Sequence, residues 1–352
     1  MKVAVVGCGR IAQAHAAAVR LLDDDASLVF CDLDADAARR TAAAFGGGPT
    51  YRTLDECLVA ERPDVVHVCT PPDTHAALAV RALSARTAVL VEKPLALSRA
   101  ETAIIASALR ERPAALCIDH NFLFEPCMLT ARGWVNAGRI GHVLAADVFY
   151  GVDPLPGEAG PGVWVHGLPG GRFTDVLPHA IYLARYFVGD VERVAACEGQ
   201  GAAGRTDLGV TLACARGLAS LRVSLAATPW ELGVVLRGEE GTIRVDLARQ
   251  RAVLAHVPRH GSRRVTQLRV AAATAAQTAL GVVDRVLGKA TGRLRGYPGM
   301  RTLIAAFHRS VRDGLPPPVP FQDGAAVVAT LETILACLRA GKTVAGARKV
   351  PA

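Results

Sequence analysis

The sequence predicts an α/β fold with two domains: residues 1–119 around a doubly wound parallel sheet, and residues 120–352 as an α+β domain with an open, mostly antiparallel sheet. Three observations predict it. A glycine-rich turn follows the first strand, short apolar strands then alternate with alanine-rich helices, and beyond residue 119 short strands follow one another directly. Alternation is typical of parallel sheets, and consecutive strands are typical of antiparallel ones. A chain of 352 residues is also long enough for two hydrophobic cores.

The chain opens on a strand and a glycine-rich turn. The apolar run Lys2–Val6 leads into Gly7-Cys8-Gly9-Arg10-Ile11-Ala12 and then into an alanine-rich helix. G-x-G-x-x-A between a strand and a helix is the opening of a Rossmann βαβ unit. Its first glycine permits the tight turn, its second lets the backbone approach a pyrophosphate, and the helix N-terminus attracts the anion. We therefore expect a dinucleotide to contact Gly7, Gly9, Arg10 and Ile11.

An acidic residue follows the second strand. Asp32 comes after the apolar run Ser27–Cys31, about twenty residues beyond the glycines, where a carboxylate bonds the ribose hydroxyls of NAD. A carboxylate repels a ribose phosphate, so NAD is favoured over NADP. Arg39 and Arg40 on the next helix weaken this preference slightly, and we interpret them as a solvated helix face. A plain turn role for Asp32 stays open as the alternative.

The remaining elements of the first domain follow from hydrophobic patterning and end signals. The run 64–69 is apolar almost throughout, which predicts a strand buried on both faces. Ser98, with Glu101 three residues on, predicts a capping box at a helix start. The predicted helices are 35–45, 54–60, 74–85 and 98–110, and the later strands are 64–69, 88–91 and 115–118.

Beyond residue 119 the strands are joined by turns. A Gly/Pro-rich loop occupies residues 151–171, and a helix is predicted from Pro178, which a first helical turn tolerates, to Val188. The run Gly238–Gly241 predicts a hairpin turn. The predicted strands are 141–150, 191–197, 207–214, 218–225, 231–236, 242–245 and 252–257, and the closing helices are 271–288, 300–313 and 324–340.

The composition argues against several classes of protein. Lys and Arg outnumber Asp and Glu by 40 to 32, but no nucleic-acid motif accompanies the formal net charge of +8, so we expect the charge to attract small anions. The nine cysteines form no C-x-x-C pair and no zinc-type cluster, which predicts a reducing cytoplasm and no metal site. No signal peptide or membrane span is predicted, and the amphipathic run 280–287 is expected to pack within the protein or on a partner subunit rather than on a membrane.

Two sets of residues carry candidate chemistry. Lys93 follows the predicted strand 88–91, at the sheet edge where open α/β sheets bind ligands. Asp175 and His179 are one helical turn apart and therefore face the same way. Spacing alone leaves other readings open: a surface lysine, an N-cap aspartate before Pro178 and a structural histidine.

Several short motifs along the chain occur together in one known family. They are Gly7–Ala12 with His15, Cys69-Thr70-Pro71-Pro72 with His75, Glu92-Lys93-Pro94, Gly138-Arg139-Ile140-Gly141, and Gly170-Gly171 before Asp175-x-x-x-His179. In this order they resemble the glucose–fructose oxidoreductase / inositol dehydrogenase (Gfo/Idh/MocA) family of NAD(P)-dependent enzymes over nearly the whole chain. The resemblance implies a Rossmann domain and an α/β domain whose open sheet often serves oligomer contacts, so a homodimer or homotetramer is expected.

The resemblance also implies site residues. Lys93, Asp175 and His179 become the catalytic group, in which His179 moves the proton, Lys93 stabilises developing alkoxide charge and Asp175 orients His179. The chain departs from the family at Tyr182, where an aspartate is common, and in the segment 119–126. Further cofactor contacts are expected from Thr70, Pro71, Pro72, His75, Glu92 and Lys93, and substrate contacts from His120, Asn121, Trp164, His166 and Tyr182.

These residues predict a soluble, cytoplasmic NAD-dependent oxidoreductase that interconverts a secondary alcohol and a ketone on a sugar, sugar nucleotide or cyclitol-like substrate. Two alternatives remain open. One is an NAD-using epimerase, lyase or glycosidase that works through transient oxidation without net redox, and the other is a non-catalytic dinucleotide-binding protein. The expected partners are a small polyol and further copies of the chain, without nucleic acid or membrane.

Overall fold

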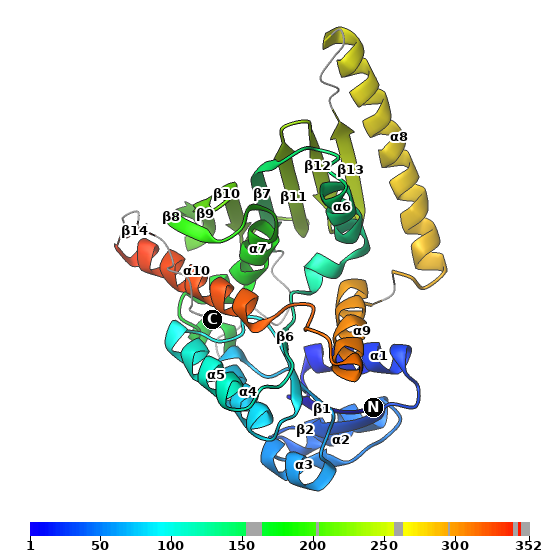
Figure 1. Cartoon of the computed structure of the whole chain (residues 1–352), viewed down its shortest axis with the longest axis vertical. Helices are drawn as coiled ribbons and strands as arrows, with labels where there is room; N and C mark the ends of the chain where they lie inside the picture. The colour runs from blue at the N-terminus through cyan, green and yellow to red at the C-terminus, as the bar shows by residue number, and fades with distance from the viewer. Residues whose placement is uncertain (153–163, 202–203, 257–262, 295, 341–343, 346–352) are drawn as a thin grey trace. The chain divides into compact units, whose positions relative to one another are not determined.

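The computed structural model describes residues 1–152, 164–201, 204–256, 263–294, 296–340 and 344–345 (Figure 1). The chain forms two compact units, and each is described by itself. The first contains Met1–Asn121 and Gly299–Ala329, and the second contains Phe122–Pro298 and the described residues beyond Ala329. The predicted single boundary at residue 119 lies close to the first division, but the chain also rejoins the first unit at residue 299.

A six-stranded sheet forms the centre of the first unit. Its strand order is β3-β2-β1-β4-β5-β6, and all of its pairs are parallel, which confirms the predicted doubly wound sheet. The central strands are buried on both faces, so their sequences are nearly continuous Val, Ala and Leu. The strands are β1 (Lys2–Val6), β2 (Ser27–Cys31), β3 (Thr50–Tyr51), β4 (Val65–Val68), β5 (Ala88–Val91) and β6 (Leu116–Ile118).

Helices with alanine-rich inner faces connect these strands. They are α1 (Arg10–Leu22), α2 (Ala35–Ala44), α3 (Leu54–Glu61), the 3₁₀ turn η1 (Pro72–Thr74), α4 (His75–Ser84) and α5 (Arg99–Glu111). The Ser98 hydroxyl caps α5 by accepting from the Glu101 N–H at 3.2 Å, as expected. The Glu101 carboxylate, however, accepts from the Leu97 N–H at 2.7 Å. The reciprocal capping box forms instead at α3, between Thr53 and Glu56.

A segment near the C-terminus completes the first unit. Helix α9 (Pro298–Asp313) lies in this unit from residue 299 on, and it buries four side chains fully at helical spacing: Met300, Leu303, Ile304 and Phe307. Beyond it, the Val319 carbonyl accepts from the Ile118 N–H at 3.2 Å and so extends the sheet edge. Helix α10 (Phe321–Ala340) starts here and crosses into the second unit after Ala329. The sheet edge left open by β6 explains why this distant segment belongs to the first unit.

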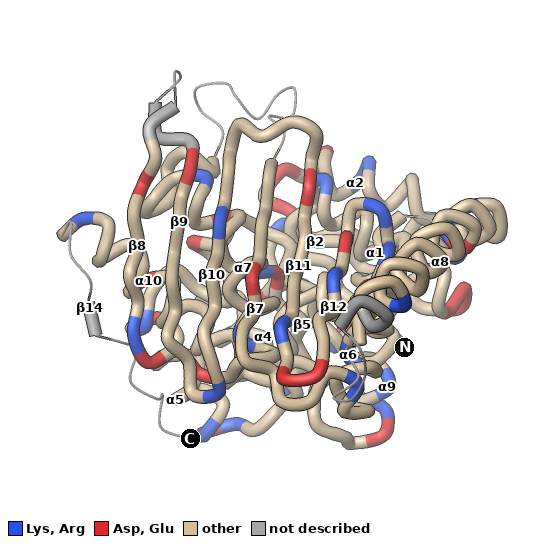
Figure 2. The backbone as a smooth tube through the Cα atoms, turned by 90° about the horizontal axis from the view of Figure 1, so that it is seen from above, with Lys and Arg blue, Asp and Glu red and all other residues tan. Residues whose placement is uncertain are grey.

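An eight-stranded sheet forms the centre of the second unit, in the order β13-β12-β11-β7-β10-β9-β8-β14 (Figure 2). Strand β7 pairs in parallel with β10, and every other pair is antiparallel among the described residues, as the sequence predicts. The strands are β7 (Val143–Gly151), β8 (Val191–Gly201), β9 (Gly204–Cys214), β10 (Gly217–Ser224), β11 (Glu231–Gly238), β12 (Gly241–Asp246), β13 (Arg251–His256) and β14 (Val344–Ala345).

Three helices of the second unit lie against this sheet. Helix α7 (Arg172–Val188) packs on β7 and β10, α6 (Pro126–Asn136) packs on β12 and β13, and α8 (Arg263–Ala290) runs along β13. Two 3₁₀ turns, η2 (Asn121–Phe124) and η3 (Trp164–Gly167), precede α6 and α7. Helix α6 was not predicted, although Pro126 at its first position is a helix-start signal.

The start of α7 corrects a prediction. The helix begins at Arg172 rather than at Pro178, which lies inside it. Proline has no N–H, so the helix loses one backbone bond at this point, and packing of its buried face offsets that loss. Asp175 therefore lies in the first turn and is not the N-cap, a position taken by Gly171 with φ of 59°.

Within the described part of the chain, two helices reach the length and hydropathy of a membrane span. The stretches are Gln267–Ala290 of α8, with mean hydropathy 1.2, and Phe321–Ala340, with mean hydropathy 1.4. The second is 61% buried inside the protein, as expected of a core helix. The first is 0% buried. Polar residues interrupt both stretches, so neither forms an uninterrupted apolar run in the sequence.

Candidate active site

The glycine turn after β1 has the shape that a dinucleotide requires. Gly7 has φ of +87°, and a Cβ at this position would lie 2.7 Å from the Thr70 side chain, so no larger residue fits. Gly9 is the N-cap of α1, with open space around it and no side chain bonded to the helix end. The first N–H groups of α1 therefore face outward without a side-chain cap, as binding of a pyrophosphate requires.

Asp32 is fixed beside this turn by two backbone hydrogen bonds. Its Oδ2 accepts from the Cys8 N–H at 2.6 Å, and its Oδ1 accepts from the Asp34 N–H at 2.8 Å. The second bond is the turn role that the sequence left open, and the first ties the carboxylate to the glycine turn. An ionised carboxylate has about four lone-pair sites, so two hydrogen bonds leave room for ribose hydroxyls.

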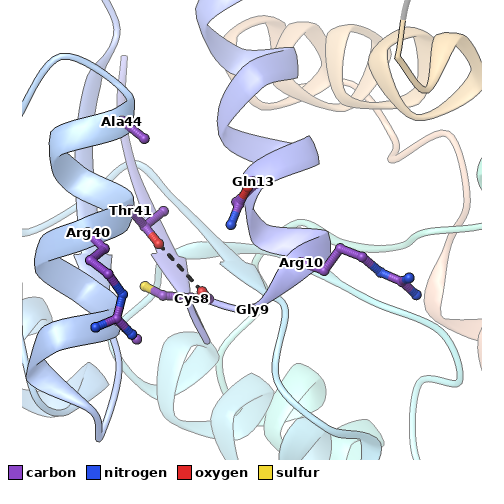
Figure 3. A pocket seen from close by; sticks show the side chains of 8 residues that line it. Cys8, Gly9, Arg10, Gln13, Arg40, Thr41 and Ala44 are labelled. Atoms are coloured by element: carbon purple, nitrogen blue, oxygen red, sulfur yellow. Dashed lines mark hydrogen bonds between the residues drawn. The ribbon is translucent and has the colours of Figure 1, made fainter. Parts of the chain in front are cut away.

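A pocket of about 340 Å³ opens between α1 and α2 (Figure 3). The Arg40 side chain lies beside Cys8 in this pocket, whereas Arg10 points away from α2 (Figure 3). The Arg40 guanidinium is 3.6 Å from the Asp34 carboxylate, and both side chains are largely exposed. Arg40 is solvated, as the sequence suggested, and it also contributes a cation to the pocket wall.

His75 joins the two loops that follow β4 and β5. Its Nδ1 is 2.7 Å from the Pro94 carbonyl, and its Nε2 is 2.8 Å from the Thr70 carbonyl. The ring is fully buried, and both of its nitrogens lie against backbone carbonyls; the expected contact with a cofactor stays a prediction. His75 thereby holds together the two loops that carry other residues expected to bind the cofactor.

Lys93 lies directly after β5 and is half-buried. The Glu92 carboxylate accepts from the Lys93 N–H at 3.1 Å through Oε2, and its Oε1 is 3.0 Å from His15 Nε2. Glu92 is 8% exposed and contacts the Lys93 backbone, so it is placed to fix the main chain at Lys93. The expected contact between Glu92 and a cofactor stays a prediction. Asp119 Oδ2 is 3.4 Å from the same His15 nitrogen but makes no hydrogen bond of normal geometry among the described residues.

Two further histidines extend this buried cluster through the first unit. His15 Nδ1 is 3.2 Å from His67 Nδ1, and His67 Nε2 is 3.0 Å from His308 Nε2 in α9. If His15 carries both protons, it donates to His67, and His67 in turn donates to His308. One charge state of His15 therefore fixes the tautomers of both neighbours.

The protonation states within this cluster follow from burial and from its neighbours. Burial and the Glu92 carboxylate raise the pKa of Asp119 to about 7. Burial opposes a charged His15, but Cys69, Asp119 and Glu92 together raise its pKa well above the ordinary value. Burial lowers the pKa of His67 well below its ordinary range and that of His308 to about 4. At neutral pH these pKa shifts favour a cationic His15, neutral His67 and His308, an ionised Glu92, and an Asp119 near the midpoint of its titration.

His179 in α7 is held by an aromatic group within the second unit. Its Nδ1 is 2.9 Å from the Tyr182 hydroxyl, and that hydroxyl accepts from the Phe122 N–H at 3.2 Å. The rings of Phe122 and Tyr150 lie 4.5 and 5.9 Å from the imidazole centroid. Tyr182 is 2% exposed and its hydroxyl lies against His179 Nδ1, which suits it to orient that ring; its expected contact with substrate stays a prediction.

The other expected residues of the second half lie in different surroundings. Asp175 is half-buried, one turn before His179 on the same helix, as predicted. His120 and Asn121 are buried, whereas Trp164 and His166 in η3 are exposed. Lys93 belongs to the first unit and His179 to the second.

The buried histidine cluster was missed by sequence reasoning. One signal for it was present, because His67 interrupts a strand that is otherwise apolar and fully buried. A polar group in such a position needs a partner. The partner, His308, is 241 residues away, and no local pattern indicates it.

Two family models match the chain. One, described as an oxidoreductase family with an NAD-binding Rossmann fold, matches residues 1–120. The other, the GFO/IDH/MocA C-terminal domain, matches residues 128–244. Together they extend over the whole parallel sheet and over the mixed sheet from β7 to β11.

Known proteins resemble the chain in sequence and in fold. Inositol 2-dehydrogenase of Rhizobium meliloti (strain 1021) is 32% identical over 186 residues, which are 53% of this chain and 54% of that protein. The chain spans about half the length of the curated relatives it matches. The structure of the WlbA dehydrogenase from Bordetella pertussis, in complex with NADH and UDP-GlcNAcA, aligns with a TM-score of 0.79 and 22% identity over 100% of this chain and 98% of that one. Levoglucosan dehydrogenase, in complex with NADH and levoglucosan, aligns with a TM-score of 0.80 and 18% identity over 99% and 100%. At these identities the two structures share the fold.

Proposed function

The chain belongs to the GFO/IDH/MocA family of NAD-binding oxidoreductases, and from this we propose that it is an NAD-dependent dehydrogenase that interconverts a secondary alcohol and a ketone. The substrate that we propose is a sugar, a sugar nucleotide or a cyclitol-like polyol. In support, the similar protein of Rhizobium meliloti is an inositol 2-dehydrogenase, and the two similar structures are complexes with NADH and either UDP-GlcNAcA or levoglucosan.

One observation in the first unit carries the proposal. The glycine turn follows β1 and Lys93 follows β5, and these strands are parallel and separated only by β4. Their carboxyl ends therefore meet at one edge of the sheet, where open α/β sheets bind ligands. His75 holds the loops after β4 and β5 together at this edge.

The residues of the first unit suit NAD. Gly7 and Gly9 leave space for a pyrophosphate at the N-terminus of α1, and Asp32 is placed beside them to accept from ribose hydroxyls. When bound, NAD would supply the hydride acceptor for oxidation of the alcohol. Arg40 in the neighbouring pocket is the one feature that would suit a ribose phosphate, and Asp32 opposes it.

Lys93 is proposed to act on the oxygen of the reacting carbon. Its ammonium group would stabilise alkoxide charge during oxidation and would polarise the carbonyl during reduction. The backbone bond from Lys93 to Glu92, and the bond from Glu92 to His15, fix the position of the lysine main chain. This buried support keeps the lysine at the sheet edge without contacting substrate itself.

His179 is proposed to move the hydroxyl proton. The Tyr182 hydroxyl contacts Nδ1, so the ring orientation is fixed and Nε2 is the atom that exchanges the proton with substrate. Tyr182 occupies the position where related enzymes commonly carry an aspartate. A neutral phenol stabilises the cationic imidazole less than a carboxylate does, which favours a neutral ring that acts as a base.

The setting that we propose is the cytoplasm. All nine cysteines are free thiols, and eight of them are buried, as expected in a reducing compartment. A homo-oligomeric assembly remains part of the proposal.

Binding and turnover measurements test this function with Lys93→Ala and, as the matched control, Lys289→Ala on α8. We expect the wild type to bind NADH and to oxidise one polyol class in a panel of inositols, anhydrosugars and nucleotide sugars. Lys93→Ala should keep its NADH affinity and lose roughly two to four orders of magnitude in kcat, whereas the control should match the wild type. Absence of NADH binding, or normal turnover by Lys93→Ala, would contradict the proposal.

A further inference from the structure

Three imidazole rings lie in a row inside the first unit. His15 Nδ1 is 3.2 Å from His67 Nδ1, and His67 Nε2 is 3.0 Å from His308 Nε2. The three rings come from α1, β4 and α9, which are separate elements of this unit. We call this set the histidine row: His15, His67 and His308. Each contact joins two ring nitrogens, so one nitrogen donates and the other accepts, and the row has a direction.

The histidine row runs from the sheet edge to the solvent beside α9. The rings of His15 and His67 are fully buried, whereas His308 keeps 7% of its surface exposed. At the inner end of the row, His15 Nε2 is 3.0 Å from the Glu92 carboxylate, which also accepts from the Lys93 N–H. The row therefore joins a carboxylate at the candidate active site to the one histidine of the row that contacts water.

The histidine row has two hydrogen-bonded arrangements with its non-hydrogen atoms in the same positions. When His15 is neutral, its Nε2 donates to Glu92 and its Nδ1 accepts from His67. His67 Nε2 then accepts from His308. When His15 carries both protons, the two bonds between the rings are reversed. A neutral imidazole has one donor and one acceptor nitrogen, so both arrangements satisfy every contact in the row.

One added proton converts the first arrangement into the second. It binds His308 at Nδ1, the nitrogen that does not contact His67, and the Nε2 proton of His308 passes to His67 Nε2. The Nδ1 proton of His67 then passes to His15 Nδ1. One N–H bond forms and one breaks at each of the outer two rings, and the net result is a second proton on His15. We propose that the histidine row is a proton relay between water at His308 and the buried carboxyl groups of Glu92 and Asp119.

The groups around the two buried rings favour a proton at the inner end of the row. Three of them raise the pKa of His15 well above its ordinary value, against the effect of burial: Cys69, Asp119 and Glu92. Burial and the two flanking histidines lower the pKa of His67 well below its ordinary range. His67 therefore passes a proton on without keeping it.

The outer ring has charges of both signs around it. Burial lowers the pKa of His308 to about 4, together with three positive groups: Arg312, His15 and the α-amino group of Met1. Asp23 acts in the opposite direction. His308 is thus neutral at rest, which leaves one of its nitrogens free to accept the next proton.

A purely structural row would have the same distances but would keep its protons in fixed places. Any side chain with one donor and one acceptor would then replace His308. Glutamine meets this condition, because its amide both donates and accepts, but it cannot exchange tautomers. His308→Gln therefore separates a proton relay from a set of satisfied buried groups. The relay does not depend on the proposed dehydrogenase activity.

Hydrogen exchange of the ring protons tests the relay, followed by NMR of the full chain labelled with ¹⁵N-histidine. In the wild type we expect the buried His15 Nδ1–H to exchange with D₂O without unfolding. His308→Gln should slow this exchange at least roughly 10-fold without a change in circular dichroism. His75 is the internal reference, because it is fully buried in the same unit but outside the histidine row. His142→Gln, at an exposed histidine of the second unit, is the matched control and should change neither rate.

The ¹⁵N shifts of the same rings test the two arrangements. His67 should carry its proton on Nε2 while His15 is doubly protonated, and on Nδ1 once His15 is neutral. Glu92→Gln brings the neutral state to lower pH, because it removes the carboxylate that stabilises the cation. A His67 that keeps one tautomer while His15 changes charge would overturn the proposal. Unchanged His15 exchange in His308→Gln would overturn it, and so would equal slowing at His75, because exchange would then depend on opening of the whole unit.

Discussion

Replacing Asp119 with asparagine changes how the stability of the first unit depends on pH. Asp119 is 1% exposed, beside Glu92 and 3.4 Å from His15 Nε2. Burial and the Glu92 carboxylate raise its pKa to about 7, so in the folded protein it keeps its proton across the mildly acidic range. Asparagine is a neutral donor of almost the same shape and cannot ionise beside Glu92.

The sign and size of the effect follow from proton linkage. In the unfolded chain Asp119 ionises near pH 3.9. Between that pH and about 7 the folded protein therefore holds one proton more than the unfolded chain, and stability falls as the pH rises. Raising the pH from about 5.5 to about 8.5 should cost the wild type about 2 kcal/mol through this residue, and almost all of that loss falls below pH 7.5.

The contribution of His15 has the same sign but is present in both proteins. Because its folded pKa is raised, its stabilisation is complete below pH 6.5 and is lost as the pH rises through the folded value. The difference between wild type and Asp119→Asn therefore isolates the carboxyl group to a first approximation. The exposed Asp24→Asn serves as the control, for which no difference between the two pH values is expected.

Urea unfolding at both pH values, followed by circular dichroism, measures the effect. The free energy of unfolding of Asp119→Asn should fall about 2 kcal/mol less than that of the wild type on going from about pH 5.5 to about 8.5. Parallel losses in the two proteins would refute the reasoning, because Asp119 would then be ionised throughout. A wild type that gains stability with pH relative to the variant would refute it as well.

Three further substitutions probe the site. Tyr182→Phe keeps the packing but removes the hydroxyl that contacts His179 Nδ1. The value of kcat/KM should fall roughly 10- to 100-fold, and the acidic limb of its pH profile should move. An unchanged pH profile would show that Tyr182 does not orient His179. Asp32→Ser removes the charge that opposes a ribose phosphate, so the affinity for NADP should rise relative to the affinity for NAD, as measured by calorimetry. An unchanged ratio of the two affinities would show that Asp32 serves only the turn. Gly7→Ala puts a Cβ 2.7 Å from the Thr70 side chain at a residue whose φ is +87°. NADH binding should therefore weaken at least 10-fold, and the melting temperature should drop by several degrees. Normal NADH binding would show that the turn tolerates a side chain.

Local rules accounted for much of the first unit. The strand β1, the turn at Gly7 and the helix α1 are neighbours in sequence, so their geometry follows from residues within one short window. The Ser98 cap is local for the same reason. Rules of this kind are weaker where packing overrides them, as at Pro178: the proline rule predicted a helix start, but the helix begins six residues earlier at Arg172.

Residue types alone did not reveal what their side chains contact. Tyr182 was expected to face substrate, yet it is buried against His179, because a phenol one turn along a buried helix face can only reach inward. His75 and Glu92 were expected to touch the cofactor; in the structure both are buried, and they contact the backbone at Pro94 and Lys93. Each of these roles depends on which face of an element is buried, and the motif does not contain that information.

Short-range signals in the sequence are enough to predict the two sheet types, the glycine turn with its acidic partner Asp32, and the placement of Lys93 after a strand and of His179 on a helix. Folding of the whole chain, by contrast, brings His15, Glu92 and Asp119 together, places His67 against His308, and returns residues 299–329 to the first unit. The physical reason is distance along the chain. The contacts His15–Glu92 and His67–His308 join residues that are 77 and 241 positions apart, so they form only when whole sheets and helices pack. The free energy of that packing comes from the whole core and not from any one segment.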